Sequence, residues 1–319
     1  MKKVISVLLL LCMLTVLLAL PEQAEGETIQ VGALTGPTAM GMVKLLADGE
    51  GTYEPTILGA ADELMPLILQ GKVDIASVPA NLASTIYNKT EGGVQVLAVN
   101  VLGVLYISEF NTQELNSLED LKGKTIYSTG QGANPEYVLR HLLTKNGLDP
   151  DKDVTIEFVA ENTELATLLA TNKATVALVP QPVATTAMLN NKSLRVALDV
   201  STLWRDITTD GSQPVMGCLI AKASTVEAYP QTIAAFLNEY KASIEAANTD
   251  VEKTAGYCET YGIIAKAAVA KAAIPNCALQ FTAGADMQKV LQGYYEVLFA
   301  ANPQAVGGAV PEASFYYVP

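Results

Sequence analysis

Four short turns carry the residue types from which a site for a small ligand could be built. Hydroxyl, carboxamide and main-chain N–H groups can all hold a ligand by hydrogen bonds, especially where a helix begins. The turns comprise Thr35, Gly36, Pro37, Thr38, Ala39 and Met40; Pro79, Ala80 and Asn81; Ser128, Thr129, Gly130, Gln131 and Gly132; and Pro180, Gln181 and Pro182. We expect these residues to bind a ligand. The single tryptophan, Trp204, either adds a stacking wall or packs in the core.

Catalytic chemistry has few candidate residues. His141 is the only histidine, and it lies in the middle of an expected helix beside Arg140. The sequence has no nucleophile elbow, Walker loop, HExxH motif or cysteine cluster with metal-ligand spacing. We therefore expect a binding protein without catalytic residues, metal or cofactor. An enzyme on the same fold that consumes its own histidine remains an alternative.

The scarcity of arginine bears on the ligand. Arg140, Arg195 and Arg205 are the only arginines, and none lies in the four turns. Arginine is the usual clamp for a carboxylate or sulfonate, so its absence favours a neutral ligand such as a planar heterocycle. A sulfonate or carboxylate could still be held by main-chain N–H groups at the turns that begin with Thr35 and Thr129.

The elements that must position these turns form a repeated unit. Strands and helices alternate in residues 29–88 and again in residues 125–188, which predicts an α/β fold with mostly parallel sheets. At a constant offset of 101, eight residues are identical: Glu63/Glu164, Leu64/Leu165, Leu67/Leu168, Lys72/Lys173, Val78/Val179, Pro79/Pro180, Ala83/Ala184 and Thr85/Thr186. This shared register predicts a duplicated unit.

Two such units imply two lobes. The apolar runs 94–108 and 214–221 are long enough to cross between them and form a two-stranded hinge. We therefore assign residues 27–105 and 216–319 to lobe 1 and residues 106–215 to lobe 2. Ligands of open α/β sheets bind beyond the carboxyl ends of the strands, where all four turns fall. The turns should therefore meet in one cleft between the lobes.

The N-terminus predicts export. Lys2 and Lys3 precede an apolar run over residues 4–20, and Ala24 and Gly26 suit a cleavage site, so residues 1–26 form a signal peptide. An uncleaved anchor, which would make the protein a ligand-sensing domain on a membrane, is the alternative. Export places the mature chain in the periplasm or at the cell surface and permits disulfides. Cys258 and Cys277 could be bridged, or could be small buried thiols.

The composition suits a folded protein and excludes one class of partner. Half of the 319 residues are hydrophobic and 17% are charged, which argues against disorder. The formal net charge is −13, whereas nucleic-acid backbones select basic surfaces. We therefore expect no nucleic-acid partner.

Several segments together resemble a known family. Glu63-Leu64, the stretch from Gly71 to Ala76 that leads to a proline turn, and the C-terminal segments 273–277 and 302–308 carry the likeness. They are similar to solute-binding proteins of ABC importers, in the branch associated with nitrate, sulfonate, taurine and thiamine-pyrimidine precursors. The resemblance implies the type II periplasmic-binding-protein fold, a monomer that closes on a small molecule, and a membrane permease as partner.

Overall fold

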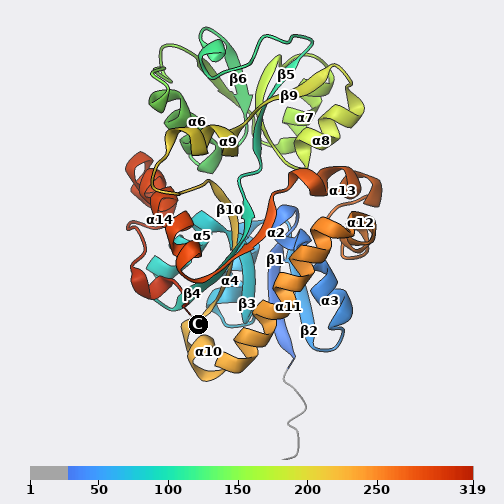
Figure 1. Ribbon diagram of the computed structural model, residues 1–319, viewed down its shortest axis with the longest axis vertical. Helices are drawn as coiled ribbons and strands as arrows, with labels where there is room; N and C mark the ends of the chain where they lie inside the picture. The colour runs from blue at the N-terminus through green and yellow to red at the C-terminus, as the bar shows by residue number, and fades with distance from the viewer. Residues whose placement is uncertain (1–27, 319) are drawn as a thin grey trace, which may run out of the picture.

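The computed structural model describes residues 28–318 and contains two sheets flanked by helices (Figure 1). The expected signal peptide, residues 1–26, lies outside the described part of the chain. The first sheet has the strand order β2-β1-β3-β10-β4-β11. Its strands are β1 (Ile29–Leu34), β2 (Tyr53–Leu58), β3 (Ile75–Pro79), β4 (Val94–Leu102), β10 (Val215–Lys222) and β11 (Leu279–Thr282). We call the body around this sheet the first lobe.

The second sheet has five strands in the order β7-β6-β8-β5-β9. They are β5 (Leu105–Phe110), β6 (Thr125–Ser128), β7 (Thr155–Phe158), β8 (Val176–Pro180) and β9 (Leu194–Asp199). We call the body around this sheet the second lobe. In Figure 1 it lies above the first lobe.

The predicted duplication appears in the topology. In the first lobe β2, β1 and β3 are parallel neighbours, and β10 runs antiparallel beside β3. In the second lobe β7, β6 and β8 are parallel neighbours, and β5 runs antiparallel beside β8. The offset of 101 superposes β3 on β8, and it superposes helix α4 (Ala61–Leu69) on helix α7 (Asn162–Ala170). The two lobes therefore repeat one α/β arrangement, as the sequence register predicts.

Helices cover both sheets. The first lobe carries α2 (Pro37–Met40), α3 (Val43–Asp48), α4, α5 (Ala80–Lys89), α10 (Ala223–Ala228), α11 (Pro230–Thr249), α12 (Val251–Thr260), α13 (Ala267–Ala273) and α14 (Gly284–Ala301). The second carries α6 (Asn134–Lys145), α7, α8 (Val183–Asn190) and α9 (Val200–Ile207). Short 3₁₀ turns span Glu119–Leu121, Ile274–Asn276, Pro303–Val306 and Ala313–Phe315. No helix of residues 28–318 is long and apolar enough to cross a membrane.

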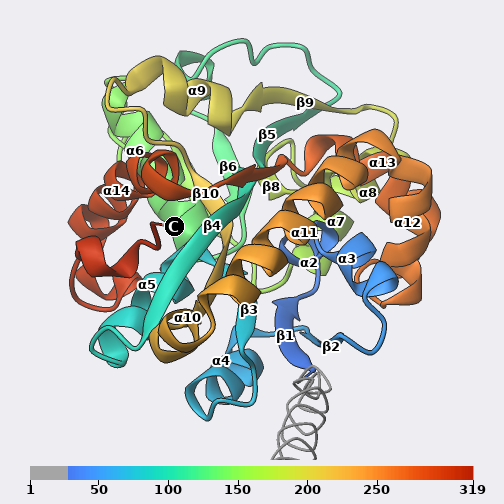
Figure 2. The same cartoon turned by 60° about the horizontal axis from the view of Figure 1, so that its bottom comes forward.

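Two connections join the lobes. One is the short step from β4 to β5 through Gly103 and Val104, and the other leads from α9 to β10. Because β4 and β10 are paired antiparallel strands, both connections leave the first lobe side by side (Figure 2). This is the geometry of a two-stranded hinge.

The cysteine hypothesis is resolved in favour of buried thiols. Cys258 and Cys277 lie in one apolar cluster with the side chains of α11, and each is fully buried. Both are free, as is the buried Cys218. Of the two alternatives for Cys258 and Cys277, this structure has the buried thiols. Burial also raises the pKa of the Cys277 thiol to about 12, so it stays protonated at neutral pH.

Candidate ligand-binding site

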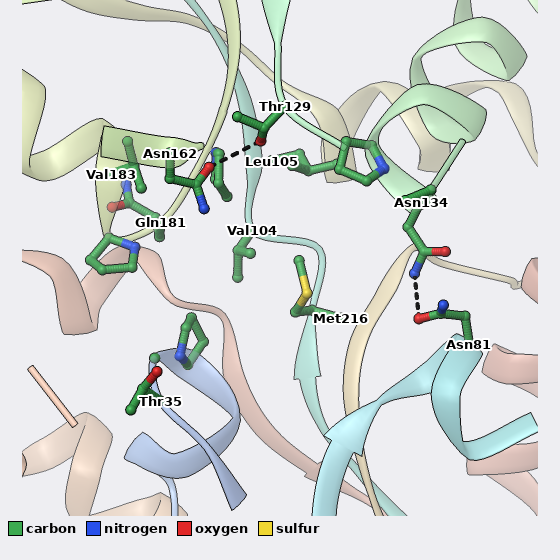
Figure 3. Close-up of a pocket in the computed structure, with 16 residues that line it drawn as sticks. Thr35, Asn81, Val104, Leu105, Thr129, Asn134, Asn162, Gln181, Val183 and Met216 are labelled. Atoms are coloured by element: carbon green, nitrogen blue, oxygen red, sulfur yellow. Dashed lines mark hydrogen bonds between the residues drawn. The ribbon is translucent and has the colours of Figure 1, made fainter. Parts of the chain in front are cut away.

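A cavity of about 360 Å³ lies between the two lobes (Figure 3). This volume falls in the range of roughly 300–1,000 Å³ that is usual for small-molecule sites. The cavity is lined by Thr35, Gly36, Pro37, Asn81, Val104, Leu105, Thr129, Ala133, Asn134, Pro135, Asn162, Pro180, Gln181, Pro182, Val183 and Met216. Every one of the four predicted turns contributes at least one residue. The structure therefore brings the turns together in one place.

The topology explains this convergence. The four turns follow the carboxyl ends of β1, β3, β6 and β8, which are equivalent strands of the two lobes. Each strand feeds directly into a helix, so the cavity is also surrounded by helix N-termini, those of α2, α5, α6 and α8. The N-terminus of α7 joins them through Asn162. The first main-chain N–H groups of a helix have no intrahelical acceptor, but Pro37, Pro135 and Pro182 have no N–H and the Thr185 N–H already donates to Gln181.

The polar side chains of the second lobe are held in place around the cavity. The Thr129 hydroxyl donates to Oδ1 of Asn162 at 3.0 Å. Oε1 of Gln181 accepts from the Thr185 hydroxyl at 2.8 Å and from the Thr185 main-chain N–H at 3.3 Å. Gln181 therefore caps the first turn of α8, a role that Pro182 at the N-cap position does not fill.

One hydrogen bond crosses between the lobes at the edge of the cavity. Nδ2 of Asn134, at the start of α6, donates to Oδ1 of Asn81, at the start of α5, at 3.1 Å (Figure 3). Other contacts between the lobes lie further away. The Tyr106 hydroxyl donates to the carbonyl of Asn276, and the Asn302 amide donates to the Tyr137 hydroxyl. The structure is thus a conformation in which the lobes touch on both sides of the cleft.

A buried polar network holds the turn at residues 35–37. The main-chain carbonyl of Thr38 accepts from the Ser77 hydroxyl at 2.6 Å and from Nδ2 of Asn100 at 3.4 Å. The same Asn100 amide donates to the Tyr240 hydroxyl at 2.7 Å, and Asn100 is fully buried. Thr38, Ala39 and Met40 are therefore buried in the core beneath the turn. They do not line the cavity, contrary to the expectation from sequence.

Other predicted residues also lie off the cavity wall. Pro79, Ala80 and Ser128 are not among its lining residues, and Ala80 and Ser128 are buried at element ends. The loop of Gly130, Gln131 and Gly132 lies outside the wall as well, with Gln131 and Gly132 exposed to solvent. Of the residues predicted from the turn after β6, only Thr129 lines the cavity.

Of the two alternatives for Trp204, the structure has the packing one. It is fully buried, its ring stands 4.8 Å from that of His141 on α6, and its indole N–H donates to the Ser212 hydroxyl. Tyr294 of α14 packs edge-on against it at 5.9 Å. Trp204 is therefore a packing residue between the lobes, because the face of α9 that carries it is directed toward α6 and α14.

His141 shares this buried environment and does not line the cavity. Its Nε2 atom is buried and has no hydrogen-bond partner within residues 28–318. Burial, assisted by nearby Lys145, lowers the pKa of His141, and Asp210 opposes this shift. The position gives no support to a mechanism in which a histidine in the cleft reacts.

Several lining residues were not predicted. Val104 and Leu105 lie in the first connection and Met216 near the second, so they form an apolar wall where the chain crosses. A hydrophobic hinge run gives no signal that separates them from core residues. Ala133, Asn134, Pro135, Asn162 and Val183 sit at helix starts. Asn134 and Asn162 are the first residues of α6 and α7, and asparagine just before an apolar periodic run is a sequence signal for a helix start.

The wall of the cavity carries no formal charge. None of the sixteen lining residues within the described chain is Asp, Glu, Lys, Arg or His. Its polar groups are hydroxyls, carboxamides and the main-chain N–H groups of helix starts. The site therefore offers both hydrogen-bond donors and acceptors, among them the buried Oδ1 of Asn134, beside apolar side chains such as Val104 and Met216.

Comparison with known proteins identifies the family. The family model for the phosphonate periplasmic substrate-binding proteins of ABC transporters matches residues 52–257. A comparison with curated protein sequences found no match. A solved ABC transporter structure from Parabacteroides distasonis is similar over 92% of this chain and 98% of that one, with 22% identity and a TM-score of 0.78.

Two further solved structures share the fold at lower identity. The periplasmic aliphatic sulphonate binding protein of Escherichia coli matches with 15% identity, 92% coverage of both chains and a TM-score of 0.71. The alkanesulfonate-binding protein of Xanthomonas axonopodis, bound to MOPS, matches over 91% of this chain and 96% of that one, with 15% identity and a TM-score of 0.63. With a family model that spans most of the chain and a two-lobed α/β fold to match, this protein belongs to the periplasmic substrate-binding proteins of ABC transporters.

Proposed function

We propose that this protein captures a small organic ligand in the cavity between its lobes and delivers it to the membrane permease of an ABC importer. The observation that supports the proposal is the convergence of four turns, two from each lobe, on one cavity. Lobe closure brings both halves of the site onto the ligand. A ligand that contacts both lobes binds the closed state more tightly, so it shifts the population toward closure.

We further propose the chemical character of the ligand. The wall is uncharged, and the NH₂ groups of Gln181 and Asn162 have no partner within residues 28–318, which favours a molecule with hydrogen-bond acceptors at one end and an apolar body that contacts Val104, Leu105 and Met216. A neutral planar heterocycle with ring carbonyls fits this description best. A sulfonate or carboxylate, with one negative charge, can be held by helix N-termini. A doubly charged phosphonate fits less well, because no cationic side chain lines the described cavity.

The proposal extends to the protein's place in the cell. We propose that residues 1–26 are removed on export, that the mature protein starts at Glu27, and that it acts outside the cytoplasmic membrane as a monomer without catalytic activity. Mass spectrometry of the exported protein tests the first point. A mass that includes residues 1–26 would instead support the anchored sensing domain.

Two measurements test capture. Native mass spectrometry of freshly purified protein should detect a bound small molecule, and a thermal-shift screen of nucleobases, sulfonates, carboxylates and phosphonates should find compounds that stabilise the fold. Small-angle scattering at saturation should then show a smaller radius of gyration. A stabilising ligand that leaves the radius unchanged would contradict closure.

A further inference from the structure

Two carboxamide side chains of the second lobe, Gln181 and Asn162, share one arrangement at the cavity. In each, the oxygen is already occupied by a threonine: Thr185 for Gln181 and Thr129 for Asn162. A carboxamide has one acceptor oxygen and one donor nitrogen at opposite corners. Two hydrogen bonds use both lone pairs of the Gln181 oxygen, and one uses a lone pair of the Asn162 oxygen, so the NH₂ groups are the parts without a partner within residues 28–318.

The orientation of Gln181 is fixed by its neighbours. Both Gln181 and Thr185 are buried, with exposed fractions of 3% and 4%. The Thr185 main-chain N–H can only donate, so the atom that faces it at 3.3 Å must be the amide oxygen. Nε2 of Gln181 makes no hydrogen bond within residues 28–318 and is not sealed from solvent. Since Gln181 lines the cavity, this NH₂ group is its free donor there.

Asn162 has a related contact on another element, although its side chain is exposed and a hydroxyl alone binds its oxygen. The Thr129 hydroxyl binds its Oδ1 at 3.0 Å, and Figure 3 shows its amide nitrogen directed into the space between Gln181 and Val104. The two NH₂ groups thus belong to different helix starts, those of α7 and α8, and face the same cavity.

The duplication makes this arrangement specific to the second lobe. Subtracting the offset of 101 places Ala80 where Gln181 stands, Ser84 where Thr185 stands and Ala61 where Asn162 stands. The Ser84 hydroxyl donates to the carbonyl of Val306, away from the cavity. The fold alone therefore does not require the threonine–carboxamide pairs.

We propose that Thr185 and Thr129 are positioning residues that turn the carboxamides of Gln181 and Asn162 so that both NH₂ groups donate to the ligand. The inference rests on the proposed function, since it assumes that the cavity is the ligand site. It assigns recognition of the acceptor end of the ligand to the second lobe. The first lobe then closes over a ligand that the second lobe has already oriented.

The orientation of the amides can be measured without a ligand. In ¹⁵N-labelled protein, the side-chain NH₂ signals are assigned by their disappearance in Gln181→Glu and Asn162→Asp variants. We expect the Gln181 NH₂ protons to exchange with water and to show no nuclear Overhauser effect to the Thr185 amide proton. A strong effect between these groups would mean that the nitrogen faces Thr185, and it would overturn the proposal whether or not the protein is a transporter component.

Binding variants test the role of the donors, with ethanesulfonate as an acceptor-only probe. In Gln181→Glu the carboxylate still accepts from Thr185 and caps α8, but it cannot donate. We expect a loss of affinity of about 10- to 100-fold, the usual consequence of an unpaired buried acceptor. Affinity should recover at low pH, where the protonated carboxyl donates again. Wild-type affinity in this variant at neutral pH would overturn the proposal.

The positioning threonines are tested by removing only a hydroxyl. Thr185→Val should weaken ethanesulfonate binding about 3- to 10-fold, the worth of one hydrogen bond, and Thr185→Ser should restore it. Ser84→Ala is the matched control in the first lobe and should leave affinity unchanged, because Ser84 does not reach the cavity. Equal affinities of Thr185→Val and wild type would overturn the positioning role.

Discussion

Replacing Gly36 by alanine tests whether the backbone of one cavity turn must have its observed shape. Gly36 precedes α2 and has φ 99° and ψ −154°, a conformation that only glycine adopts without strain. A methyl group added at its Cα would meet no heavy atom within 4 Å. Any effect of Gly36→Ala therefore comes from backbone strain and not from a clash.

The backbone strain sets the size of the free-energy loss expected for Gly36→Ala. Holding alanine in this region costs about 1–3 kcal/mol. If the variant keeps the turn, its unfolding free energy falls by this amount. If the turn relaxes instead, ligand binding must restore it, and the binding free energy falls by the same amount. The losses in unfolding free energy and in binding free energy should therefore sum to about 1–3 kcal/mol. If the turn relaxes fully, the dissociation constant rises about 5- to 150-fold.

Urea denaturation and isothermal titration calorimetry on the same preparations measure the two losses. Gly51→Ala is the control, since Gly51 has φ 85°, no heavy atom within 4 Å of the added methyl and a place outside the cavity. This control should lose about 1–2 kcal/mol of folding free energy and no affinity. If Gly36→Ala keeps both wild-type stability and wild-type affinity, the reasoning about this turn is refuted.

Three further predictions follow from the contacts between elements. The lowered pKa of His141 means that the unfolded chain takes up its proton first, at its ordinary pKa of about 6.5. The stability contributed by neutral His141 is thus complete above about pH 6.5 and is lost as the pH falls through the pKa of His141 in the folded state. Thermal melts of the His141→Gln variant should lack this pH dependence. Fluorescence of Trp204, the only tryptophan, should change over the same pH range in the wild type alone. Asn134→Ala removes the hydrogen bond to the first lobe, so the closed population should fall about 2- to 10-fold relative to the open one, seen as a larger radius in small-angle scattering without ligand. Denatured, unreduced mature protein should titrate as three thiols, and fewer thiols would contradict free Cys258 and Cys277.

Much of the fold could be predicted because its signals are local and repeated. The register from Glu63 to Thr85, matched at an offset of 101, corresponds to equivalent helices and strands in the two lobes. Turn residues after apolar runs mark the carboxyl ends of strands, so Thr35, Asn81, Thr129 and Gln181 could be expected in one cleft. Periodicity and turn chemistry carry this kind of information.

The finer composition of the site could not be predicted. Which side of a turn faces the cavity depends on packing from distant segments, as with Thr38, whose carbonyl is held by Asn100. Trp204 is buried by His141 and by Tyr294, which is 90 residues further along the chain. Asn162 enters the cavity because a hydroxyl 33 residues earlier holds its oxygen. These relations are tertiary contacts, and no local pattern encodes them.

Hydrogen–deuterium exchange with and without the ligand found by screening tests the central claim most directly. If two matching lobes close on a ligand at their turns, main-chain exchange should slow together in residues 35–40, 79–82, 129–135 and 180–185. Slowing at saturation in only one lobe, or in none of these segments, would contradict capture between the lobes.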